Sequence, residues 1–128
     1  MRRRLRPGLT LLVDIPGTGD PVRRQQNYQI HLRLWLNGGE PVRWKTAWGP
    51  TDVARLEDDG KTLITVVRVD RRSLINGLFY GVEGMRVGGM RRLEIAPHLA
   101  YGERGVPGTI PPAAVLVAEI TILEPAGR

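Results

Sequence analysis

The sequence has no cysteine and only two histidines, His31 and His98. The absence of cysteine excludes disulfide bonds, thiol catalysis and cysteine-ligated zinc, and it suits a reducing compartment. Two histidines are too few for a multi-histidine metal site within one chain, and neither has a visible partner for general acid–base catalysis. We therefore expect a protein that uses no metal and no cofactor.

Long hydrophobic runs are also missing. No stretch approaches the roughly 18 apolar residues that a membrane-spanning helix requires. The apolar run LTLLV at residues 9–13 is too short for the core of a signal peptide and is soon followed by Asp14 and Pro16. We therefore expect a cytoplasmic protein with no membrane association.

Aromatic residues are scarce, with three Trp, three Tyr and one Phe. Basic residues are in excess, since 19 Lys and Arg against 13 Asp and Glu give a net charge of +6. The arginines are spread along the chain with carboxylates between them, and no basic block is interleaved with stacking aromatics. This distribution favours a solvated surface, and we expect no nucleic-acid binding. The alternative, an arginine-rich nucleic-acid binder, would show steep salt dependence.

What is present is typical of one globular domain, because 41% of the residues are hydrophobic and 128 residues can bury an ordinary core. Residues 28–36 alternate strictly, so that five apolar side chains share one face of a strand. The residue pattern predicts further strands at 9–15, 42–48 (an edge strand), 62–69, 90–95 and 115–123.

One good helix is predicted at residues 73–82, where apolar residues recur at helical spacing and Ser73 is the candidate N-cap. A short helical stretch is predicted at 52–56. We assign residues 1–8 to a basic, flexible arm and residues 9–125 to a single domain with an insertion at 49–61. The fold class is α+β, with a five- to six-stranded antiparallel sheet and one short helix.

An unusual loop, LAYGERGVPGTIPP, occupies residues 99–112. Its glycines and prolines exclude a helix or a central strand. It also carries Tyr101, Val106 and Ile110, which an ordinary polar surface loop would not contain.

The segment from Gly81 to Glu124 closely resembles the FKBP family of peptidyl-prolyl cis-trans isomerases. The motifs that carry the resemblance are GMRVG, RRLEIAP, LAYG and IPP followed by an apolar strand, in that order and spacing. Agreement is weaker over residues 14–39 and poor over 40–72. The resemblance implies a strongly bent antiparallel sheet wrapped around one short helix, a ligand groove between helix and sheet, and a flap formed by the 99–112 loop.

Carried over residue by residue, the resemblance makes Tyr101 a hydroxyl donor and Ile75 a backbone N–H donor to a carbonyl of the bound substrate. Substrate contacts are then expected from six apolar residues, which are Leu32, Val42, Leu74, Leu78, Ile110 and Ala118.

Several of these positions lack the aromatic side chain that the family usually has there, namely Leu32, Val42, Leu78 and Ala118. Arg43 stands where the family has an aspartate, and the strand before the helix offers Thr65 and Val67 in place of phenylalanine. Trp44, Trp48, Phe79 or Tyr80 could refill the groove from new directions.

The function implied is isomerisation of X–Pro bonds in proline-containing peptides or proteins, with weakened activity and weak macrolide binding. Rotation about the amide faces a barrier of about 18–20 kcal/mol, and no nucleophile or metal is needed to lower it. An apolar groove that excludes water and a positioned donor suffice in principle. The alternative is a catalytically silent module of the same fold that binds a peptide segment.

Overall fold

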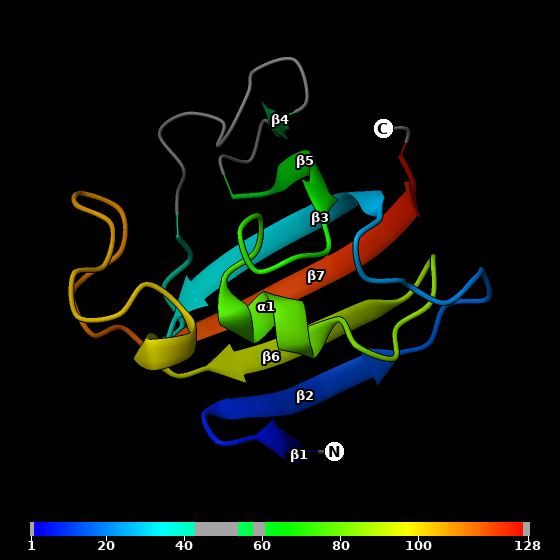
Figure 1. The fold of residues 1–128 in the computed structure, drawn as a ribbon. Coiled ribbons are helices and arrows are strands. Elements are labelled where there is room, and N and C mark those ends of the chain that lie inside the picture. The colour runs from blue at the N-terminus through cyan, green and yellow to red at the C-terminus, as the bar shows by residue number, and fades with distance from the viewer. Residues whose placement is uncertain (1, 43–53, 58–60, 127–128) are drawn as a thin grey trace.

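The structure is a computed structural model that describes residues 2–42, 54–57 and 61–126. Its strands form a single antiparallel sheet in the order β1-β2-β6-β7-β3-β5-β4 (Figure 1). The strands are β1 (Arg3–Arg6), β2 (Leu9–Ile15), β3 (Asn27–Leu36), β4 (Ala54–Leu56), β5 (Leu63–Arg68), β6 (Met90–Ile95) and β7 (Leu116–Pro125). One α-helix, α1 (Asn76–Gly81), lies over one face of the sheet, and a short 3-10 helix, η1 (Pro97–Leu99), follows β6.

The α+β fold class is therefore confirmed, with seven strands in place of five or six. The extra strands come from the two ends of the sheet. Residues 1–8 were predicted to be a flexible arm, but Arg3–Arg6 form β1 and pair with β2. The predicted helical stretch at 52–56 is also wrong, because Ala54–Leu56 form β4 against β5. In both cases pairing with an adjacent strand overrides a weak local propensity.

The core lies on the helix-covered face, where β3 and β7 present their apolar side chains. The period-two pattern of β3 buries Tyr28, Ile30, Leu32 and Leu34, each at most 4% exposed. Their partners across the sheet are buried as well, since Ile30 pairs with Ile122, Leu32 with Ile120, and Leu34 with Ala118. The alternation of apolar and polar residues predicted these strands correctly. Successive side chains of a strand point to opposite faces of the sheet, and here one of the two faces is buried.

The helix is shorter at its start than the predicted 73–82. Its N-cap is Ile75, and Ser73 belongs to the preceding turn. The carboxylate of Asp70 organises that turn by accepting the backbone N–H groups of Arg72 and Ser73 at 3.0 and 2.8 Å. An aspartate that binds the backbone two and three residues ahead stabilises a turn, so the helix begins only after it.

Two glycines allow α1 to lie close to the sheet. A Cβ atom added at Gly81 would lie 2.5 Å from Cδ1 of Leu93, and one added at Gly77 would clash with the side chain of Ile95. Both sheet residues are fully buried, so any larger helix residue would push α1 away from β6. This close packing fixes where the first turn of α1 stands relative to β3 and β5.

Within the described residues, no helix is long and apolar enough to cross a membrane. The same residues contain no group of three or more His, Asp or Glu side chains that could hold a metal ion. The predicted edge strand at 42–48 falls largely on residues 43–48, which lie outside the described residues.

Candidate functional site

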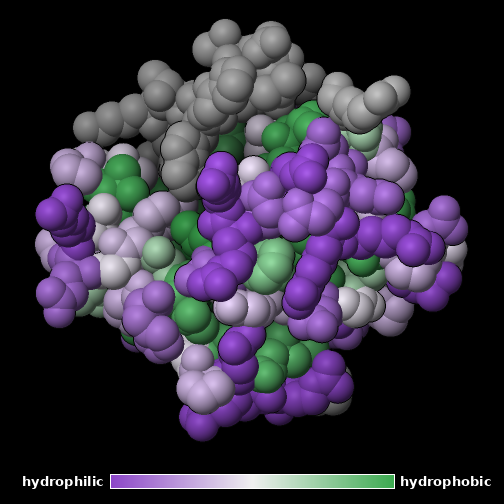
Figure 2. Space-filling view, viewed as in Figure 1, coloured by the Kyte–Doolittle hydropathy of each residue, from purple (hydrophilic) through white to green (hydrophobic). Residues whose placement is uncertain are grey.

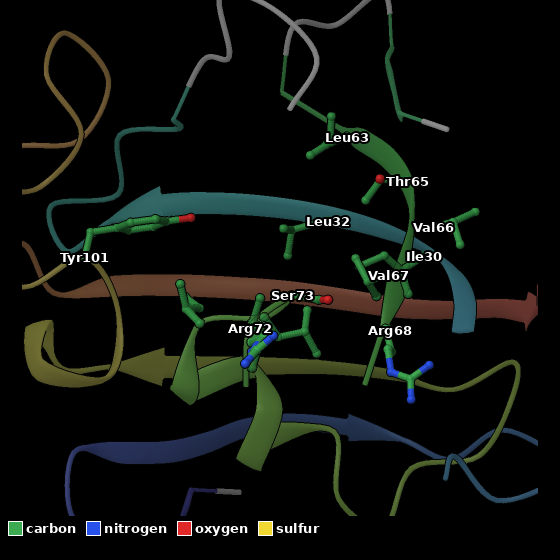
Figure 3. Close-up of a pocket in the computed structure, with 13 residues that line it drawn as sticks. Ile30, Leu32, Leu63, Thr65, Val66, Val67, Arg68, Arg72, Ser73 and Tyr101 are labelled. Atoms are coloured by element: carbon green, nitrogen blue, oxygen red, sulfur yellow. The ribbon is translucent and has the colours of Figure 1, made fainter. Parts of the chain in front are cut away.

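A cavity of about 350 Å³ lies between β3, β5 and the start of α1 (Figure 3). Strands β3 and β5 form one wall, the turn before α1 and its first residues form the second, and Tyr101 closes one end. The described residues that line it are Ile30, Leu32, Leu63, Thr65, Val66, Val67, Arg68, Arg72, Ser73, Leu74, Ile75, Leu78 and Tyr101. The lining is mostly aliphatic, with arginine at two positions.

Tyr101 reaches the cavity from the loop that follows η1, and its ring extends toward Leu32 (Figure 3). Hydrogen bonds fix the loop at this point, because the N–H of Gly102 donates to the carbonyl of Pro97 at 2.8 Å and the N–H of Gly105 donates to that of Tyr101 at 3.1 Å. Gly102 and Gly105 have φ values of +65° and +63°, which few other residues adopt without strain. The glycines of the LAYGERG segment therefore hold Tyr101 in place.

Burial raises the pKa of the Tyr101 hydroxyl above its ordinary value. A phenol in an apolar environment resists ionisation because the phenolate would lose its hydration. The hydroxyl therefore stays protonated and keeps its capacity to donate a hydrogen bond at any physiological pH.

The turn before α1 supplies the opposite wall and the charged rim. Asp70 accepts the N–H of Ser73, which lowers the pKa of its carboxyl below the ordinary value, with further contributions from the N–H of Arg72 and the charge of Arg68. The guanidinium of Arg68 lies 3.1 Å from the Asp70 carboxylate and donates to the side-chain carbonyl of Gln25. Asp70 thus anchors both the turn and one of the two cavity arginines.

Five of the eight predicted site residues meet at this cavity: Leu32, Leu74, Ile75, Leu78 and Tyr101. No backbone hydrogen bond among the described residues uses the N–H of Ile75, the predicted donor. Ile75 and Tyr101 therefore lie at the same cavity, and their role as hydrogen-bond donors to a substrate stays a prediction.

The other three predicted contacts, Val42, Ile110 and Ala118, are not among the described lining residues. Each is buried in the core, with an exposed fraction of 2%, 3% and 0%. Ile110 pairs with Val106 through two backbone hydrogen bonds of 2.8 Å, which draw the flap loop into a tight hairpin. Ala118 lies between Leu34 and Leu93 in the sheet, where core packing covers it completely.

Sequence reasoning missed both arginines of the lining. Arg72 is part of an Arg–Arg pair that reads as ordinary solvated charge, and only its place just before the helix marks it as a site residue. Thr65 and Val67 line the cavity in the positions expected for the strand before the helix. Of the four aromatic residues that could refill the groove, Phe79 and Tyr80 do not line the cavity among the residues that the structure describes. Trp44 and Trp48 lie outside the described residues.

Comparison with known proteins decides the family. Residues 21–123 match the family described as FKBP-type peptidyl-prolyl cis-trans isomerase. The chain belongs to this family. Its FKBP fold is also that of FkpA from Escherichia coli, which matches 98% of this chain and 53% of its own with 26% identity and a TM-score of 0.72.

Curated relatives of the FKBP family match a shorter part of the sequence. FK506-binding protein 4 of Chaetomium thermophilum is 53% identical over 58 residues, which are 45% of this chain and 12% of the relative. The peptidyl-prolyl cis-trans isomerase FPR2 of Saccharomyces cerevisiae is 53% identical over 51 residues, 40% of this chain and 38% of the relative. The match thus spans well under half of either relative.

Proposed function

We propose that this chain is a peptidyl-prolyl cis-trans isomerase that binds the proline of an X–Pro segment in the cavity beside Ile75 and Tyr101. The observation that carries the proposal is the cavity itself. Its volume of about 350 Å³ falls at the lower end of the range for small-ligand sites, and its walls are mostly aliphatic. A proline ring and one neighbouring side chain are occupants of suitable size and polarity.

The chemistry follows from the nature of the amide bond. The planar amide is more polar than the twisted one, so a water-poor, aliphatic cavity disfavours the planar form relative to the transition state. Ile75 and Tyr101 both line this space, and their N–H and hydroxyl are the donors that we assign to carbonyl groups of the bound segment. Each 1.36 kcal/mol by which these effects lower the barrier raises the rate about tenfold.

We infer that the activity is weak and that macrolide ligands bind poorly. Tyr101 is the only aromatic residue among the described lining residues, so the walls provide less of the flat, polarisable surface that aromatic side chains give. The same observation favours a second candidate function, a silent module that binds proline-containing segments without isomerising them. A cytoplasmic location and a role in protein folding remain predictions.

The test is an NMR exchange measurement of cis–trans rates in short X–Pro peptides with catalytic amounts of protein. We expect a measurable acceleration that Tyr101→Phe lowers by about threefold to tenfold, the value of one hydrogen bond. Tyr80→Phe is the matched control, because Tyr80 stacks under Arg6 at 3.6 Å and is not a described lining residue. Val67→Trp, which fills the cavity from β5, should abolish the acceleration.

Wild-type protein that leaves the exchange rate at background, while still binding the peptide, would identify the silent module. Catalysis that survives Val67→Trp in a folded protein would place the reaction elsewhere and contradict the proposal.

A further inference from the structure

The rim of the cavity carries positive charge that the proposed reaction does not use. Among the described lining residues two are arginines, Arg68 and Arg72, and none is acidic. Figure 2, seen from the same side as Figure 1, shows strongly hydrophilic side chains gathered over the face in front of α1. In Figure 3 the guanidinium of Arg72 lies across the start of the helix.

The two arginines differ in how far their charge is already compensated. Arg68 is held by the carboxylate of Asp70 at 3.1 Å and by the side-chain oxygen of Gln25 at 2.9 Å. Asp70 in turn is engaged by Arg68 through one carboxylate oxygen and by two backbone N–H groups through the other. The Arg72 side chain is exposed and makes no ion pair or hydrogen bond with a described residue.

We propose that Arg72 selects X–Pro segments that carry an acidic residue directly beside the proline. This inference rests on the proposed function, because it assumes that the cavity holds a proline. A guanidinium at the rim of an otherwise aliphatic cavity attracts a carboxylate, and its planar fork of donors suits that group better than any neutral one. The ion pair stays near solvent, so little hydration is lost when it forms.

The experiment compares peptides that differ only in charge. Glu-Pro is measured against the isosteric Gln-Pro, and Pro-Glu against Pro-Gln, in the same NMR exchange assay, with peptide affinity recorded by NMR titration. We expect kcat/KM for at least one glutamate peptide to exceed that of its glutamine partner by about twofold to fivefold, the range of an exposed ion pair. The preference should disappear as salt rises from about 0.01 M to about 1 M, because the Debye length falls from about 30 Å to about 3 Å.

Two substitutions at Arg72 test whether this residue causes the preference. Arg72→Gln should bring the preference for glutamate over glutamine to about one, and Arg72→Glu should favour Lys-Pro over Gln-Pro. Arg71→Gln is the matched control, since it removes the same charge from an exposed neighbour that is not a described lining residue. It should keep the preference.

Equal rates and affinities for both peptide pairs in the wild type overturn the inference while the isomerase function stands. A preference that Arg71→Gln removes and Arg72→Gln keeps also overturns it. If no peptide is isomerised, the proposed function fails, and the affinities alone then decide: a glutamate preference lost in Arg72→Gln supports the inference, and equal or undetectable binding overturns it.

Discussion

Arg91 is the only buried charged side chain among the described residues, with 6% of its surface exposed. Its guanidinium donates to the carbonyls of Gly81 and Glu83 at 2.8 and 2.7 Å and lies 3.2 Å from the carboxylate of Asp14. It thereby joins the end of α1 to β2 and satisfies the carbonyl of the last helix residue and a second carbonyl just beyond the helix. The family motif RRLEIAP contains this residue, but the motif alone does not say which of its two arginines is buried.

We expect Arg91→Ala to lower the free energy of unfolding by about 3 kcal/mol or more, because it leaves Asp14 and two carbonyls without their donor. Arg92→Ala is the control on the same strand. Arg92 is 43% exposed in its pair with Glu119, so its removal should cost about 1 kcal/mol or less. Urea unfolding of the two variants measures the difference. Equal losses would show that Arg91 contributes no more than a surface charge.

Residue-scale prediction from sequence succeeded where a residue's place in a motif or a period determines its surroundings. Alternation along β3 and helical spacing along α1 turn Leu32 and Leu78 toward the helix–sheet interface, and the LAYG motif places Tyr101 in the loop after β6. It failed where packing determines exposure, because Ala118 occupies a wall position of the family yet is completely covered here. It also missed Arg72 as a lining residue, because the place of Arg72 depends on the turn that Asp70 forms and not on a local pattern.

Among the elements, the central strands were predictable and the helix start was not. Because one face of the sheet is buried, apolar residues recur at every second position along β3, β6 and β7, and this pattern can be recognised in the sequence. The start of α1 depends on a competition between Ser73 as a helix cap and Asp70 as a turn former, and propensity alone does not resolve it. The turn that Asp70 forms directly precedes Ile75, the N-cap residue that lines the cavity.

The close packing of α1 against β6 can be tested by enlarging a helix residue at the contact. We expect Gly77→Ala to destabilise the protein by about 1–3 kcal/mol, because the new methyl group meets the buried side chain of Ile95 and the packed core cannot absorb it. The higher helix propensity of alanine offsets up to about 1 kcal/mol of this cost. The isomerase rate should fall as well, because α1 carries Leu78 to the cavity.

Gly38→Ala is the matched control, since a Cβ there would meet no atom of a described residue within 4 Å. Thermal unfolding and the peptide exchange assay report on both variants. If Gly77→Ala is as stable and as active as Gly38→Ala, close packing against β6 does not position the helix.

At the scale of the whole molecule, β1 covers an edge that would otherwise be open. Composition alone assigned its residues to an arm, because four arginines among residues 2–6 read as a solvated tail. Pairing with β2 gives this segment a structural role, and the half-buried Leu5 and the stacking of Arg6 on Tyr80 add contacts that no local pattern reveals. Charged side chains on an edge strand are one general device that disfavours pairing with a second molecule.

We therefore expect removal of residues 2–6 to lower stability by about 1–3 kcal/mol and to promote association, because the edge of β2 loses its partner. Light scattering and urea unfolding measure the two effects. The control replaces Arg3 and Arg4 by glutamine in the full chain, which removes charge but keeps the backbone pairing, so it should retain the stability. A truncated chain that stays monomeric and equally stable would mean that these residues are the dispensable arm that composition suggests. If the glutamine variant associates while its stability is unchanged, the charge of β1, and not its pairing with β2, prevents association. In that variant the backbone of β2 remains paired.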